Sequence, residues 1–219
     1  MRIVLMGPPG AGKGTQATRL VEKFGMTHLS SGDIFRAEKA SGSELGNKLA
    51  DIIDRGELVP DDIVVEMMAK AITAVEGGLL LDGFPRTVAQ AKALDDTLAG
   101  MGEKLDAIIL IVADEDAIVE RICARRKCPT CGKDYNIKFI PSAKGEYCDV
   151  CPGDVKLAIR DDDNEDVVRA RMVNYRNQTE PVISYYKDAG KVKVVEINGN
   201  QGLDQVAGDI ANAMETLKS

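Results

Sequence analysis

Short apolar runs alternate with longer amphipathic segments along the chain. Five runs have the length and aliphatic composition of β-strands, and they cover residues 2–6, 27–30, 78–82, 107–112 and 192–197. The fourth run is apolar at every position, which is typical of a strand buried on both faces. Strands that alternate with helices favour right-handed crossovers, so we expect a parallel sheet covered by helices on both sides.

The segments between these runs carry apolar residues at helical spacing. In residues 61–75, for example, Ile63, Met67, Met68 and Ile72 repeat with the helical period. Six helices are predicted in this way, at residues 15–23, 61–75, 87–98, 115–126, 165–187 (interrupted at Pro181) and 203–217.

Two stretches depart from the alternation. Residues 32–59 have helical patterning without a strand, and residues 127–159 are rich in cysteine, proline and glycine. We interpret the second stretch as a small inserted module. The acidic run at residues 161–166, which begins with Asp161, then fits the N-terminus of the next helix, where the helix dipole favours negative charge.

Composition and charge exclude several functions. The chain has 219 residues, enough for one or two domains, and 29% charged and 44% hydrophobic residues are typical of a folded protein. A net charge of −7 leaves no broad basic face for nucleic-acid phosphates. No apolar run approaches the ~20 residues of a membrane helix. The N-terminal apolar stretch is too short for a secretory signal, so we expect a cytoplasmic protein.

A single histidine, His28, limits the catalytic chemistry. Sites that need two histidines are excluded, and a Ser-His-Asp triad is open only if His28 takes part. Because His28 lies in an apolar run, a half-buried structural role is favoured. Cys123 falls in a helical segment, where we expect a small core residue.

A glycine-rich loop follows the first predicted strand and precedes the first predicted helix. Its sequence is Gly7-Pro8-Pro9-Gly10-Ala11-Gly12-Lys13-Gly14-Thr15. Glycines let backbone N–H groups converge on one anion, the helix N-terminus adds positive potential, and Lys13 adds a mobile full charge. Gly14 replaces the Ser or Thr that usually follows the lysine, and Thr15 comes next. We predict that this loop binds phosphate through Gly10, Ala11, Gly12, Lys13, Gly14 and Thr15.

Four cysteines in the inserted module form two Cys-x-x-Cys pairs. The pairs are Cys128 with Cys131 and Cys148 with Cys151, and sixteen residues lie between the first pair and the second. This spacing is typical of a zinc ribbon with four thiolate ligands. Such a site has no open coordination position and is structural. Fe²⁺ or Co²⁺ can occupy the same thiolates, and disulfides are the alternative. The basic residues around the first pair leave nucleic-acid binding open as an alternative.

The phosphate loop and later motifs, taken in order, resemble the adenylate kinases and other nucleoside monophosphate kinases. The later motifs are Leu29-Ser30-Ser31-Gly32-Asp33-Ile34-Phe35-Arg36, Leu81-Asp82-Gly83-Phe84-Pro85-Arg86-Thr87 and the arginine clusters at Arg121, Arg125, Arg160 and Arg171. The resemblance spans essentially the whole chain. It implies an α/β fold with a P-loop NTPase-type five-stranded parallel sheet flanked by helices. It also implies domain boundaries: core at 1–29, 60–126 and 161–219, an inserted helical NMP (AMP)-binding domain at 30–59, and a zinc-ribbon-like metal-binding lid at 127–160.

The implied reaction is MgATP + AMP ⇌ 2 ADP in a closed cleft lined by arginines. Two polyphosphates repel strongly in a dry site, and arginine suits this task because it stays protonated and grips phosphate oxygens in pairs. The resemblance assigns Arg36 and Arg86 to the acceptor α-phosphate, and Arg121 and Arg125 to the donor phosphates. Arg160 and Arg171 are expected to bridge the transferring group, with contacts to AMP. They share a helical face if the helix extends back far enough. Arg55, Arg126 and Arg169 are left as surface or structural residues.

The resemblance also places the metal and the two bases. Asp82 and Thr15 are expected to hold Mg²⁺, directly or through water, with help from Asp33; helix or turn capping is the alternative role of the two carboxylates. Gln90 offers a donor and an acceptor to the adenine of AMP. The remaining acceptor contacts are Ser31, Glu57, Leu58, Val59, Gly83, Phe84 and Pro85. The remaining donor contacts are Asp134, Tyr135 and Gln201, although Tyr135 fits a packing role in the lid equally well.

Two other interpretations stay open. A related kinase that phosphorylates UMP or CMP is opposed by Gln90 and by the long cysteine-containing insert. The second interpretation is a regulatory protein that binds ATP without turnover and uses the insert to bind a partner. ATP, AMP and ADP are the expected partners, with no nucleic acid and no membrane, and we expect a monomer.

Overall fold

The computed structural model describes residues 1–55, 57–160, 162–190 and 192–218. A five-stranded parallel sheet forms its centre, in the order β2-β3-β1-β4-β7. The strands are β1 (Arg2–Met6), β2 (Thr27–Ser30), β3 (Leu79–Asp82), β4 (Ala107–Val112) and β7 (Lys193–Asn198). The expected parallel sheet is therefore confirmed, with strand ends displaced by one residue at β3 and β7.

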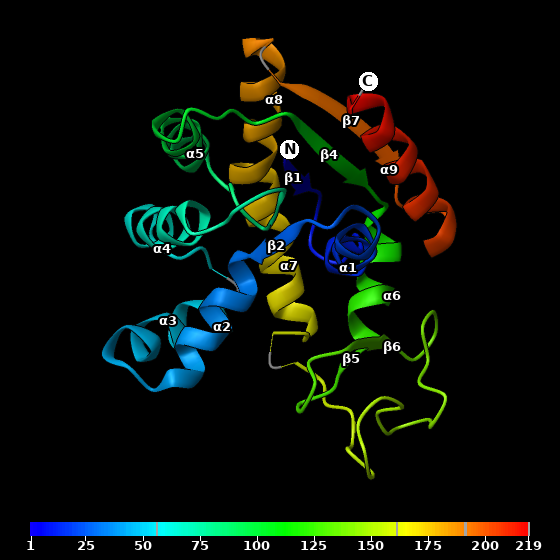
Figure 1. Cartoon of the computed structure of the whole chain (residues 1–219). Helices are drawn as coiled ribbons and strands as arrows, with labels where there is room; N and C mark the ends of the chain where they lie inside the picture. The colour runs from blue at the N-terminus through cyan, green and yellow to red at the C-terminus, as the bar shows by residue number, and fades with distance from the viewer. Residues whose placement is uncertain (56, 161, 191, 219) are drawn as a thin grey trace.

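Helices cover both faces of this sheet, because alternate strand residues point to opposite sides. Val4, Leu81 and Ile108 pack with the helices α4 (Asp61–Thr73), α5 (Val88–Gly100) and α8 (Glu180–Ala189). Ile3, Leu80 and Ile109 pack with α1 (Lys13–Phe24) and α9 (Leu203–Lys218) on the other face. Figure 1 shows α1 and α9 on one side of the strands and α4 and α5 on the other.

Within the stretch 32–59, two segments form helices, as its patterning predicts. They belong to α2 (Ser31–Ser41) and α3 (Glu44–Asp54). Each helix begins after a serine whose hydroxyl accepts a hydrogen bond from a backbone N–H of the first turn: Ser30 from Asp33 and Ser43 from Gly46. The two helices project from the sheet as a separate arm (Figure 1).

The predicted helix at 115–126 is wrong at its C-terminal end. Helix α6 covers Glu115–Cys123, and the next residues form β5 (Arg125–Lys127), which pairs antiparallel with β6 (Asp134–Asn136) in the inserted module. Cys123 is exposed, contrary to expectation, because α6 turns Ile118 and Ile122 inward and Cys123 lies about 100° around the helix from Ile122.

The break in the predicted 165–187 helix lies upstream of Pro181. Helix α7 covers Glu165–Asn174, a π-helical turn covers Tyr175–Thr179, and α8 follows. Pro181 has no N–H and its ring crowds the carbonyl four residues earlier, so the widened turn comes before it.

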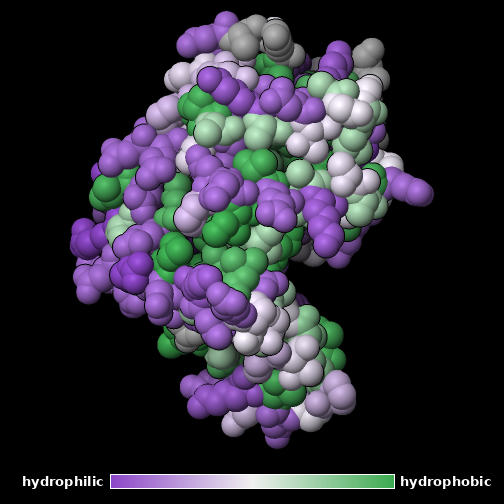
Figure 2. All heavy atoms as spheres, turned by 90° about the vertical axis from the view of Figure 1, so that its left-hand side faces the viewer, coloured by the Kyte–Doolittle hydropathy of each residue, from purple (hydrophilic) through white to green (hydrophobic). Residues whose placement is uncertain are grey.

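Among the described residues, no helix combines the length and the apolar composition needed to cross a membrane. Figure 2 shows that the face on the left of Figure 1 is covered mostly by hydrophilic residues, with hydrophobic atoms exposed between them.

The packing of α5 on the sheet yields a prediction for stability. Leu94 is fully buried, so we expect Leu94→Ala to lower the free energy of unfolding by about 3 kcal/mol, from lost burial and an unfilled cavity. Chemical denaturation followed by circular dichroism measures this change. Lys92→Ala, at an exposed position of the same helix, is the control. A loss below about 1 kcal/mol for Leu94→Ala would contradict the packing described here.

Candidate active site

All five parallel strands end at one edge of the sheet, and segments that follow several of them line a common cleft. The phosphate loop follows β1, Asp82 ends β3 and Gly199 follows β7. The cleft has a volume of about 720 Å³. Ligand sites of open parallel sheets form at this edge, outside the carboxyl ends of the strands.

The phosphate loop needs glycine at its bends. Gly7 and Gly10 have φ values of 144° and 80°. A Cβ at Gly7 would lie 2.4 Å from the carbonyl oxygen of Ile111, and one at Gly10 would lie 2.8 Å from the side chain of Ile122. Larger residues would therefore push the loop away from β4 and α6.

Lys13 begins α1 and curls back over the loop. Its Nζ donates hydrogen bonds to the carbonyl oxygens of Gly7 and Pro8, at 2.8 and 2.9 Å. Burial lowers the pKa of Lys13 to about 8; Asp82 opposes this shift, and repulsion from Arg86 and Arg171 adds to it. The ammonium group thus lies among other cations, in an environment that favours the arrival of negative charge.

Every arginine predicted to act on phosphate lines this cleft together with Lys13. They come from different parts of the chain: Arg36, Arg86, Arg121, Arg125, Arg160 and Arg171. Burial lowers the pKa of Arg86, and it lowers the pKa of Arg171 to about 10. Arg121 donates a hydrogen bond to the carbonyl of Gly199 at 2.7 Å, which joins α6 to the segment after β7.

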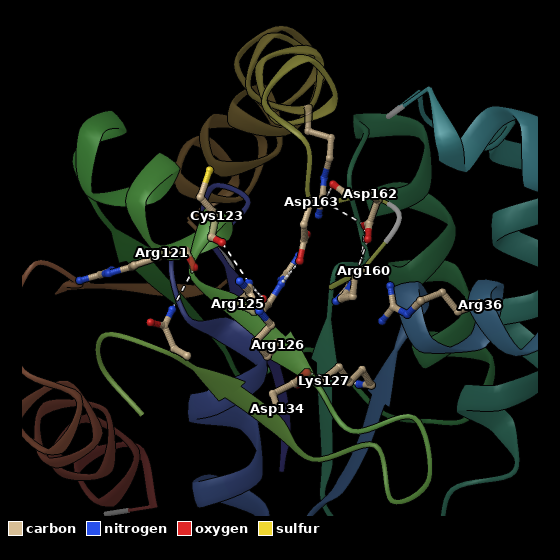
Figure 3. A network of polar contacts seen from close by, with 12 residues as sticks. Arg36, Arg121, Cys123, Arg125, Arg126, Lys127, Asp134, Arg160, Asp162 and Asp163 are labelled. Carbon is tan, nitrogen blue, oxygen red and sulfur yellow. Dashed lines mark hydrogen bonds and ion pairs between the residues drawn. The ribbon is translucent and has the colours of Figure 1, made fainter. Parts of the chain in front are cut away.

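Two adjacent carboxylates hold three of these arginines. Asp162 accepts two hydrogen bonds of 3.0 Å from Arg160 and one of 3.0 Å from Arg171. Asp163, whose side chain is fully buried, accepts two from Arg125. Figure 3 shows the Arg125 and Arg160 guanidinium groups turned toward these carboxylates. Although burial opposes it, the charges of Arg160 and Arg171 hold the pKa of Asp162 well below its usual range.

The expected shared helical face for Arg160 and Arg171 is wrong. Helix α7 begins at Glu165, so only Arg171 lies on it, and the two side chains meet through Asp162 instead. Asp161 lies outside the described residues. Residues 164–166 behave as expected at a helix start: Asn164 caps α7 by accepting from Val167 N, and Glu165 and Asp166 lie in its first turn.

The residues expected at Mg²⁺ lie close to the phosphate loop. Asp82 is 9% exposed and lines the cleft together with Thr15. His28 is half-buried, as predicted, with its Nε2 3.7 Å from Asp82 Oδ2. Asp33 also lines the cleft, but its carboxylate is hydrogen-bonded to Arg36. Oxygen ligands beside a phosphate loop fit Mg²⁺. Asp82 fits this role better than Asp33, because within the described part of the chain no arginine forms an ion pair with its carboxylate.

A smaller cavity of about 70 Å³ adjoins the cleft beside α2 and α3. Several of the predicted acceptor contacts line it: Arg36, Glu57, Leu58, Val59, Gly83, Arg86 and Gln90. Ser31 lies close by and donates a hydrogen bond of 2.6 Å to the carbonyl of Gly83. Phe84 and Pro85 are joined by a cis peptide bond, and Pro85 lines a neighbouring cavity.

Gln90 is held in a fixed orientation. It is 1% exposed; its Nε2 donates to Asp61 Oδ1 at 2.7 Å, and its Oε1 accepts from the backbone N–H of Arg86 at 2.8 Å. The second hydrogen of Nε2 and the second lone pair of Oε1 are left to meet a base. Sequence reasoning missed Asp61, because a carboxylate in the first turn of a helix is ordinarily explained by the helix dipole.

One end of the cleft, where the donor contacts are expected, lies between the inserted module and α9. Asp134, Tyr135 and Gln201 line it, as does Gln16, which sequence reasoning missed. Tyr135 is only 3% exposed, and its hydroxyl donates to Asp149 at 2.5 Å. This places its ring in the core of the inserted module, as in the packing alternative.

The four paired cysteines converge in that same core. The sulfur atoms of Cys128, Cys131, Cys148 and Cys151 lie within 4.8 Å of one another. The hydroxyl of Tyr135 is 3.2 Å from Cys148 Sγ. Four thiols that converge in this way fit a tetrahedral metal ion.

The remaining arginines lie as expected. Arg55 pairs with Glu57 and Arg169 with Glu165, both at the surface. Arg126 donates to the backbone carbonyls of Cys123 and Arg125.

Comparison with known proteins agrees with this geometry. The family model described as adenylate kinase matches residues 5–191. A protein of Clostridium botulinum (strain 657 / Type Ba4) named adenylate kinase is 46% identical over 216 residues, 98% of each chain. An adenylate kinase of Bacillus licheniformis is 46% identical over 96% of each chain, and one of Archaeoglobus fulgidus is 42% identical over 100% of each. The chain therefore belongs to the adenylate kinase family.

Proposed function

We propose that the protein transfers a phosphoryl group reversibly from MgATP to AMP and so forms two ADP. The observation that carries this proposal is the convergence of Lys13 and six arginines on one cleft at the carboxyl edge of the sheet. So many cations are needed only where two polyphosphates must approach each other, because their repulsion in a shielded site is large.

The two nucleotides have separate places in this cleft. The donor phosphates lie on the phosphate loop, with Lys13, Arg121 and Arg125, and the donor base lies beside Gln201. The acceptor lies against α2 and α3, where Arg36 and Arg86 hold its α-phosphate and Gln90 meets its adenine. In this arrangement the acceptor oxygen approaches the γ-phosphoryl group in line with the bond that breaks.

The acceptor oxygen is ionised at neutral pH, so no general base is required, and positioning and charge supply the rate. Arg160 and Arg171 move from Asp162 toward the transferring group as the module 127–160 closes over the donor. Closure excludes water, which would otherwise compete with AMP for the phosphoryl group.

Asp82 and Thr15 hold the Mg²⁺ of MgATP, directly or through water. When bound there, the ion neutralises charge on the β- and γ-phosphates. Asp82 ends β3 beside the phosphate loop, and its Oδ2 lies 3.7 Å from His28 Nε2.

The four cysteines hold one structural metal ion, for which Zn²⁺ is favoured over Fe²⁺ or Co²⁺ by tetrahedral thiolate geometry. The inserted module is too small to fold on its own core, so the metal supplies much of its folding free energy. We assign domains at 1–29, 60–126 and 161–219 (core), 30–59 (AMP binding) and 127–160 (lid). A cytoplasmic monomer stays a prediction.

The acceptor preference tests the function directly. In an assay of ADP formation with MgATP, we expect turnover with AMP to exceed that with UMP, CMP or GMP by about 100-fold or more, because Gln90 matches the adenine edge. Equal or faster turnover with a pyrimidine nucleotide would favour the related kinase instead. Binding of ATP without any AMP-dependent ADP formation would leave the regulatory interpretation.

Lys13 supplies a second test. We expect Lys13→Ala to lower kcat by about 10³-fold, because it removes a charge directed at the transferring phosphates. Circular dichroism should show an unchanged fold. Lys23→Ala, at the other end of α1 in a surface ion pair with Glu215, should retain activity. Retention of most activity by Lys13→Ala would refute the role of the loop.

The cysteine site is tested by Cys128→Ser. We expect metal analysis to fall from about one ion per chain toward zero, with a lower melting temperature and some remaining activity. Cys123→Ser, which alters an exposed cysteine outside the cluster, is the matched control. A melting curve for Cys128→Ser that matches that of the metal-bound parent would count against a structural metal.

A further inference from the structure

Gln16 is a buried polar residue in the wall of the donor end of the cleft. It lies in the second half of the first turn of α1, three residues after Lys13, and is 1% exposed. Its Nε2 donates a hydrogen bond of 3.1 Å to the carbonyl of Leu203, the first residue of α9. Its Oε1 is buried and has no hydrogen-bond partner within the part of the chain that the structure describes.

This unpaired oxygen calls for a physical explanation. A buried acceptor that has lost water and gained no donor destabilises the folded protein, so such groups are rare. An apolar side chain at this buried position would carry no such cost. This cost is removed if a bound ligand supplies a hydrogen-bond donor to Gln16 Oε1.

The surroundings indicate which ligand this is. Gln16 lines the cleft together with Gln201, Gly202 and Leu203, the segment beside which we place the donor base. The carbonyl of Leu203 already accepts from Gln16, and Arg19 reaches it at 3.5 Å, so it is engaged within the protein. The Gln16 oxygen is thus a free side-chain acceptor at the donor-base end.

Adenine and guanine differ at the position that such an acceptor can distinguish. Adenine carries an amino group at C6, which donates hydrogen bonds, whereas guanine carries a carbonyl oxygen there, which only accepts. A side-chain acceptor that faces this position accepts a hydrogen bond from adenine and repels the carbonyl oxygen of guanine. Both interactions favour ATP over GTP as the donor.

We propose that Gln16 is a specificity-determining residue for the donor base: its Oε1 accepts from the 6-amino group of ATP while its Nε2 holds the segment at Leu203 in place. This inference rests on the proposed function, because it assigns the donor base of that reaction. It makes the preference for ATP over GTP depend on a side chain as well as on the backbone.

The test uses Gln16→Met, which keeps the length of the side chain and removes the amide. Three donors are compared at saturating AMP: ATP, GTP and purine riboside triphosphate, which lacks the 6-amino group. We expect kcat/KM for ATP to fall about tenfold or more. The value for purine riboside triphosphate should stay within about twofold, since this donor does not make the lost hydrogen bond. The value for GTP should stay the same or rise, since the repulsion between Gln16 Oε1 and the guanine carbonyl is removed.

Gln205→Met is the matched control, because Gln205 is exposed on α9 and does not line the cleft. It should leave all three values unchanged. A role of Gln16 confined to holding α1 against α9 would instead lower kcat/KM for the three donors by one common factor. That result, or an unchanged ratio of ATP to purine riboside triphosphate, would overturn the proposal.

If Gln16→Met does not fold, comparison of the donors on the wild-type protein still tests the proposal. Equal kcat/KM for ATP and purine riboside triphosphate would show that nothing in the site meets the 6-amino group, and the proposal would fall. A preference for ATP of about tenfold or more is the expected result. Failure of the proposed function is distinct, since it appears as absent AMP-dependent ADP formation in the wild type with every donor.

Discussion

The structure depends on one electrostatic constraint: a group of cations must stay charged and close together in a partly shielded cleft. Lys13, Arg86 and Arg171 have pKa values lowered by burial, and their mutual repulsion contributes. Carboxylates offset part of the repulsion among these cations. Asp162 and Asp163 hold three of the arginines, and Asp82 lies near Lys13. Binding of two polyphosphates replaces repulsion among cations with attraction to anions.

The fold supplies this concentration of charge through its topology. Parallel strands bring their carboxyl ends to one edge, so short loops from distant parts of the chain converge there. The loop after β1 contributes Lys13, and the segment after β3 contributes Arg86. The helical arm and the cysteine module bring further arginines from either side, and both project from the sheet where they can close over it (Figure 1). The buried sheet gives these groups a rigid support.

Much of this was predictable because the strongest signals are local. The apolar runs identify the five strands, and the glycine-rich loop identifies the phosphate site. The errors come from tertiary contacts. Arg125 and Arg126, predicted to be helical, belong instead to β5, because this strand pairs with β6. The carboxylate partners Asp162 and Asp163 were not recognised, because an acidic run at a helix start has an ordinary explanation. No sequence pattern indicates a role for Gln16. That role is inferred from its buried Oε1, which has no hydrogen-bond partner among the described residues.

A crystal structure with a dinucleoside pentaphosphate, in which five phosphates join two adenosines, tests the central claim most directly. Lys13, Arg86, Arg160 and Arg171 should then contact the shared phosphates, with Arg160 and Arg171 drawn away from Asp162 toward them. If these side chains remained on their carboxylate partners or pointed into solvent while both adenosines were bound, the cations would have another purpose and this account of the cleft would be contradicted.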